Sequence, residues 1–67
     1  MKEIDARGLS CPEPVMLTID ALKTTKETFK VLVSEPHQKM NVEKYARDYN
    51  RESEAVEKDG YFEVVIK

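Results

Sequence analysis

The chain has 67 residues, one cysteine, and a formal net charge of −2 from 11 basic and 13 acidic side chains. A chain of this length buries only about 60% of its unfolded surface, so its core is small and it is too small to enclose a substrate. One cysteine excludes a disulfide framework and a multi-cysteine metal site. The mixed charges argue against a nucleic-acid partner. The lack of a long apolar run argues against a signal peptide or membrane span.

The first predicted elements are a short strand and the helix that follows it. Apolar and polar residues alternate over residues 3–7, which is the period of a strand. Gly8 ends the strand, because glycine tolerates a bend with positive φ. Pro12 suits the first position of a helix, where its missing N–H would have had no intrahelical partner. We expect this helix to run from Pro12 to Thr24 or Thr25.

One face of this helix is predicted to pack against the core. At 3.6 residues per turn, Val15, Thr18 and Leu22 share this face, with Ile19 and Ala21 on its flanks. Met16 and Leu17 fall outside it. Two interpretations of this pair stay open: partial burial at the edge of the sheet, or an exposed apolar collar on which a partner protein docks.

Residues 28–34 are predicted to form the second strand. The strand has Phe29, Val31 and Val33 on one face and Lys30, Leu32 and Ser34 on the other. Leu32 therefore shares the open face of the sheet with Tyr61 and Val65 of the last strand. That face is either solvated surface or a second docking surface.

The second helix is predicted to begin late, after a break at Glu35–Pro36. Asn41 is a good N-cap residue, which places Val42 at the first helical position. Asn50 tolerates the left-handed conformation that ends a helix. His37, the single histidine, then lies in a polar loop as a solvated side chain.

Two further strands are predicted at the end of the chain. Residues 52–58 form a weakly patterned strand, whereas apolar and polar residues alternate clearly over residues 61–67. Asp59-Gly60 between them is a strong hairpin signal. The order β-α-β-α-β-β predicts a two-layer α/β sandwich with a mixed four-stranded sheet and both helices on one face. We expect residues 1–67 to form a single domain.

Cys11 is the residue with the most evident chemistry, because it falls at or next to the start of the first helix. The helix dipole and the unpaired backbone N–H groups there favour a thiolate, which is the reactive form of cysteine. Arg7 adds a positive charge and Glu13 a negative one, while Pro12 and Pro14 stiffen the approach to the sulfur. We therefore expect the Cys11 thiol to ionise somewhat more readily than a free cysteine. The competing interpretation is a small buried hydrophobe without chemistry.

The run Arg7-Gly8-Leu9-Ser10-Cys11-Pro12-Glu13-Pro14 resembles the signature of the TusA/SirA-like sulfur carriers, which is Cys-Pro-x-Pro preceded by Arg-Gly. Members of this family are sulfurtransferases that carry a persulfide on this cysteine, and the resemblance implies the fold predicted above. It also implies that Cys11 is the catalytic residue. Residues that support the thiolate or the helix start would then be Arg7, Gly8, Pro12, Glu13 and Pro14. The Asn41-Val42 pair is similar to a selenium-metabolism (YedF-like) branch, in which this domain stands at the N-terminus of a longer chain.

These observations favour a sulfur relay protein in the reducing cytoplasm, where a lone cysteine stays unpaired. Cys11 would accept a persulfide sulfur from a donor such as a cysteine desulfurase or a rhodanese and pass it to an acceptor protein. The protein would be a sulfurtransferase of the carrier type, with no cofactor, no metal, and no nucleic-acid or membrane partner. The alternative is a non-catalytic regulatory or binding module of a larger, selenium-related protein, in which Cys11 transfers nothing.

Overall fold

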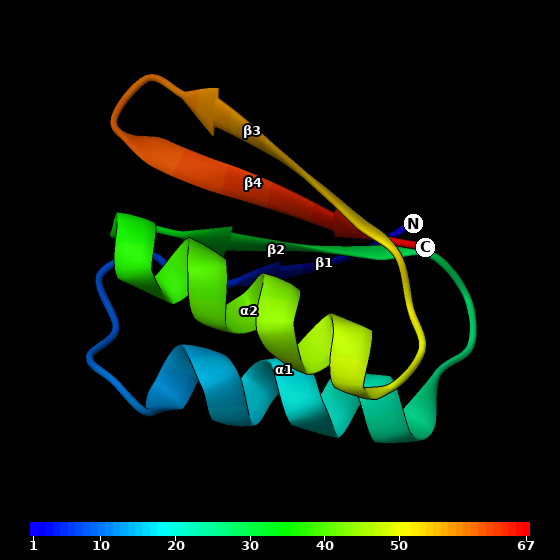
Figure 1. Ribbon diagram of the computed structural model, residues 1–67. Helices are drawn as coiled ribbons and strands as arrows, with labels where there is room; N and C mark the ends of the chain where they lie inside the picture. The colour runs from blue at the N-terminus through cyan, green and yellow to red at the C-terminus, as the bar shows by residue number, and fades with distance from the viewer.

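The computed structural model describes residues 1–67 as four strands and two helices in two layers. The elements are β1 (Lys2–Asp5), α1 (Glu13–Thr24), β2 (Phe29–Val33), α2 (Pro36–Asp48), β3 (Ser53–Lys58) and β4 (Tyr61–Ile66). Both helices cover the same face of the sheet (Figure 1). The two-layer α/β fold predicted from the sequence is therefore confirmed. Neither helix is long and apolar enough to cross a membrane.

The sheet is mixed and has the strand order β1-β2-β4-β3. β1 pairs with β2 in parallel, whereas β4 is antiparallel to both β2 and β3. β4 thus lies between the two strands that α2 connects, so β2 and β3 run parallel without pairing. The hairpin between β3 and β4 turns at Gly60, whose φ of +87° is a conformation that favours glycine.

β2 supplies the middle of the hydrophobic core. Its residues Phe29, Val31 and Val33 are fully buried on the helix-covered face, as the alternation of the sequence predicts. The other core residues are Ala6, Ala21, Leu22, Val42, Ala46, Val64 and Ile66. The loops at the two ends of the sheet lie at the margin of this core, where hydrogen bonds hold them.

The buried face of α1 is rotated from the predicted one. Its buried residues are Pro14, Thr18, Ala21 and Leu22, whereas Val15 and Ile19 are only half-buried. The Thr18 hydroxyl donates to the Pro14 carbonyl one turn earlier, at 2.8 Å, so this polar side chain is buried with its hydrogen bond satisfied. The helix begins at Glu13, with Pro12 as N-cap, which is one residue later than predicted.

The predicted start of the second helix is wrong. α2 begins at Pro36 with Glu35 as N-cap, so Asn41 and Val42 lie inside the helix. Proline at the first helical position gives up no hydrogen bond, and this signal outweighs the one from Asn41. His37 consequently lies in the first turn of α2 rather than in a loop, although its side chain is exposed as predicted.

Arg51 holds the end of the fold that lies away from Cys11. Its guanidinium donates to the carbonyls of Thr25 (3.1 Å), Glu27 (2.8 Å) and Lys67 (2.6 Å). One side chain thereby joins the turn after α2, the α1–β2 connection and the end of β4, which meet at the same side of the molecule (Figure 1). Asn50, in the left-handed conformation predicted for it with φ of 60°, precedes this junction.

We predict that Arg51→Ala lowers the free energy of unfolding by about 1–2 kcal/mol, because one partly buried and two exposed carbonyls lose a charged donor that joins three segments. Urea unfolding followed by circular dichroism measures the change. Arg47→Ala is the matched control, since Arg47 is exposed on α2 and outside this junction. Equal stability of the two variants would contradict the role given to Arg51.

Candidate functional site

Cys11 lies in the loop between β1 and α1, directly before the N-cap residue Pro12. The thiol is free and exposed, which rules out the interpretation of Cys11 as a buried hydrophobe. The loop lies at the end of the sheet where α2 also begins (Figure 1). No surface pocket is present, so a reacting group reaches Cys11 from open solvent.

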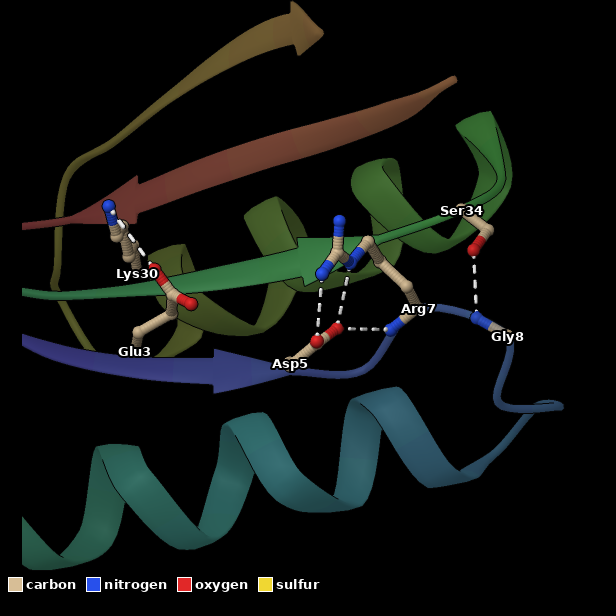
Figure 2. A network of polar contacts seen from close by, with 6 residues as sticks. All are labelled: Glu3, Asp5, Arg7, Gly8, Lys30 and Ser34. Atoms are coloured by element: carbon tan, nitrogen blue, oxygen red, sulfur yellow. Dashed lines mark hydrogen bonds and ion pairs between the residues drawn. The ribbon is translucent and has the colours of Figure 1, made fainter. Parts of the chain in front are cut away.

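Three hydrogen bonds to its main chain, one from a backbone partner and two from side chains, hold the Cys11 loop against the end of β2 and the start of α2. They run from the Ala6 N–H to the Leu32 carbonyl (2.9 Å), from the Gly8 N–H to Ser34 Oγ (2.8 Å), and from Gln38 Nε2 to the Leu9 carbonyl (2.9 Å). Figure 2 shows the second of these, where the chain turns away from the sheet at Gly8. The φ of Gly8 is +78°, so glycine suits this bend, as predicted.

The N-terminal end of α1 offers fewer free donors than the sequence suggests. Pro12 and Pro14 have no N–H, and the Glu13 N–H donates to the Ser10 carbonyl at 2.9 Å. Of the first-turn donors, this leaves the Val15 N–H without a backbone acceptor. The positive end of the helix dipole therefore lies near Cys11 with a single unpaired first-turn N–H, that of Val15.

Arg7 makes a different contact from the one expected with the Cys11 thiolate. Its guanidinium binds the Asp5 carboxylate through two hydrogen bonds of 2.9 Å each, and its backbone N–H donates to the same carboxylate at 3.2 Å (Figure 2). The guanidinium carbon also lies 4.7 Å from the centre of the Tyr61 ring. These hydrogen bonds lower the pKa of Asp5 to about 2 and raise that of Arg7. The charge of Arg7 is thus paired with Asp5 on the open face of the sheet.

The contact between Arg7 and Tyr61 crosses the sheet, because β2 lies between β1 and β4. It covers the end of β2, where Leu32 is only 4% exposed although its side chain is on the face without helices. Asp5 and Glu63 flank Leu32 in the register of the neighbouring strands. The prediction that Leu32 contributes to an exposed surface is therefore wrong, since neighbouring side chains cover it.

The remaining charges on this face also pair with one another. Lys30 lies 3.3 Å from Glu3 and 3.8 Å from Glu63, and Lys58 lies 4.0 Å from Glu63. Figure 2 shows the first of these pairs, between β1 and β2. Sequence reasoning missed Asp5 and Tyr61 as partners of Arg7. The spacing of Asp5 and Arg7, two residues apart on one side of the chain, is the signal that could have found the first.

Met16 and Leu17 lie on the first turns of α1 after Cys11. Met16 is 58% and Leu17 38% exposed, so both residues reach solvent, Met16 more than Leu17. The Met16 N–H donates to the Pro12 carbonyl at 3.0 Å. Met16 therefore lies one helical turn beyond Pro12, the residue next to Cys11. Glu13 is exposed on the same turn, whereas Pro14 is buried beneath it.

Comparison with known proteins places this loop in a family. The chain matches the model of the sulfurtransferase TusA family over residues 2–67. It belongs to the TusA family. It is also similar to the crystal structure of a SirA-like protein from Desulfitobacterium hafniense, with 38% identity, a TM-score of 0.92, and coverage of 98% of this chain and 95% of that chain. No curated protein matches the sequence. Membership of the TusA family implies a role in carrying sulfur together with other sulfur-transfer proteins.

The Asp5–Arg7 pair predicts an acid-range titration that can be followed at one residue. The pKa of Asp5, about 2 in the folded protein, lies below its ordinary value of 3.8. A carboxyl with a depressed pKa stabilises the fold above the unfolded pKa, and this contribution is lost as the pH falls through the folded pKa. Because the pair is exposed, its effect on stability is small and weakens with salt.

We therefore expect the Asp5 carboxyl to titrate near pH 2 by NMR, and Arg7→Gln to move the midpoint up toward 3.8. Arg47→Gln, which removes an exposed arginine elsewhere on the surface, should leave the Asp5 midpoint in place. An unchanged midpoint in Arg7→Gln would show that Arg7 does not hold this carboxylate in solution.

Proposed function

We propose that the protein is a cytoplasmic sulfur relay protein that accepts a persulfide sulfur on Cys11 and passes it to an acceptor protein. The observation that carries this proposal is the position of the single cysteine. It is exposed at the start of α1, in a loop held by hydrogen bonds to β2 and α2, within a chain of the TusA family. Residues 1–67 act as one domain in this proposal.

The transfer consists of two thiol exchanges. The Cys11 thiolate attacks the outer sulfur of a donor persulfide, the bond between the two donor sulfurs breaks, and the donor cysteine leaves as a thiolate. An acceptor thiolate then attacks the outer sulfur now bound to Cys11, and the Cys11 thiolate leaves. No net oxidation or reduction occurs, so the steps need no cofactor. A cysteine desulfurase or a rhodanese is a suitable donor.

The neighbouring motif residues prepare the loop for this reaction. Gly8 permits the bend away from the sheet, and Pro12 and Pro14 fix φ at the start of α1. Arg7 acts on the loop through Asp5 and Tyr61 rather than at the sulfur. Met16 and Leu17 form the apolar collar beside the thiol on which donor and acceptor dock.

The second candidate is a regulatory or binding module of a larger, selenium-related protein. The exposed residues Met16 and Leu17 favour protein binding in this case as well. The two candidates differ in the fate of Cys11, which carries sulfur in the first and is chemically idle in the second.

The relay predicts that the protein gains the mass of one sulfur atom when it is incubated with a cysteine desulfurase and cysteine. Intact-mass spectrometry detects the gain, and reduction by a thiol should reverse it. Cys11→Ala should gain nothing, because the chain has no other cysteine. Absence of loading with several desulfurases and rhodaneses, and with small-molecule persulfides, would refute the relay and favour the binding module.

The docking collar predicts a separate effect on KM. Replacing both Met16 and Leu17 with Gln should raise the KM for a protein donor about tenfold, because two exposed apolar contacts at the interface are lost. Loading by a small-molecule persulfide should be unchanged. Met40→Gln is the matched control, since Met40 is 63% exposed but lies on α2. An equal effect of Met40→Gln would place the docking surface elsewhere.

A further inference from the structure

Gln38 is a buried polar residue that the proposed chemistry does not use. Its side chain is in the first turn of α2 and only 4% exposed. Both ends of its amide have partners, since Oε1 accepts the Glu35 N–H at 3.2 Å and Nε2 donates to the Leu9 carbonyl at 2.9 Å. A buried amide whose two ends bond different segments fixes those segments relative to each other.

The bond to Leu9 reaches the Cys11 loop from 29 residues away in the sequence. Leu9 stands two residues before Cys11. Between β1 and the thiol, its carbonyl is the last loop group that a side chain from a distant part of the sequence bonds. From there to α1 the loop has two further backbone bonds, both from the first turns of α1: the Glu13 N–H donates to the Ser10 carbonyl and the Met16 N–H to the Pro12 carbonyl. The position of the Cys11 backbone therefore depends on the hydrogen bond from Gln38 to Leu9.

We infer that Gln38 is a positioning residue for sulfur transfer at Cys11. Through the Leu9 carbonyl it fixes the main chain beside the thiol, and through the Glu35 N–H it ties that position to the start of α2. Attack on a persulfide needs the incoming sulfur in line with the bond that breaks, so a small displacement of Cys11 slows transfer within the docked complex. This role in transfer rests on the relay function proposed above, whereas the tether itself does not.

Gln38→Glu separates the two hydrogen bonds of this residue. The carboxylate keeps an oxygen that can accept the Glu35 N–H, as glutamate does at this position of a capping box. It replaces the donor to Leu9 with a second acceptor, which repels the Leu9 carbonyl. Gln38→Met has a similar volume, removes both bonds and buries no charge. Arg51→Ala, at the other end of the molecule, controls for a general loss of stability.

The test is single-turnover loading from a donor enzyme, at a pH well above the range in which a glutamate titrates. Gln38→Glu and Gln38→Met should lower the rate at saturating donor about tenfold and leave the donor concentration for half-saturation unchanged. Alkylation of Cys11 by iodoacetamide should change less than about twofold, because a small reagent needs no docked alignment. Arg51→Ala should load at the parental rate. Parental loading in both folded Gln38 variants, or an equal loss in Arg51→Ala, would overturn the inference.

The parent protein gives a measurement that requires neither folding of a variant nor sulfur transfer. Because the Gln38 side-chain amide is buried and bonded to Leu9, its protons should exchange with water more slowly than those of Asn50, which is exposed. Exchange at the same rate as Asn50 would overturn the tether. Slow Gln38 exchange in a protein that no donor loads would retain the tether and reject the relay.

Discussion

The Cys11 loop keeps its shape through hydrogen bonds to one continuous stretch of chain, residues 32–38, and the site depends on that support. Ala6 bonds to the Leu32 backbone, Gly8 to the Ser34 side chain and Leu9 to the Gln38 side chain, so contacts that begin next to the β1–β2 pairing extend through side chains to α2. β2 crosses the middle of the hydrophobic core, which is small because the chain is short. The loop is therefore attached to the part of the molecule with the most burial, although its own cysteine is exposed.

The Arg-Gly pair of the motif divides between the two faces of the sheet. Arg7 stays on the open face with Asp5 and Tyr61. Gly8 turns the chain toward the helix layer, where the loop continues through Cys11 into α1. As a result, Arg7 fixes the chain where it leaves β1 for the Cys11 loop. Because its charge is paired with Asp5, the N-terminal end of α1 is the remaining source of positive potential near the sulfur. A free cation beside the thiolate would hold it more tightly but would also make it a weaker nucleophile.

The alternation of residues 3–7, 28–34 and 61–67 and the Asp59-Gly60 turn were sufficient to predict the order of elements and the faces of the strands. The place of Cys11 at a helix start was also predictable, because the bend at Gly8 and the helix start at Pro12 depend only on neighbouring residues. The start of α2 was not, because two capping signals compete and Gln38, which belongs to the chosen cap, also bonds to a residue 29 positions away. The partner Tyr61 of Arg7 and the cover over Leu32 depend in the same way on contacts between distant strands.

A relay protein must present one sulfur to two partners in turn, which sets opposing demands on its site. Burial would protect a persulfide and fix its position, but it would also keep the acceptor thiolate from reaching the outer sulfur on Cys11. An exposed thiol on a loose loop would be open to both partners and aligned with neither. The hydrogen bonds that Ser34 accepts from the Gly8 N–H and that Gln38 donates to the Leu9 carbonyl meet both demands, because they hold the main chain before Cys11 and do not involve the sulfur. Under the proposed relay function, recognition would fall to the exposed side chains of α1, so donor and acceptor would use overlapping surfaces and occupy them one after the other.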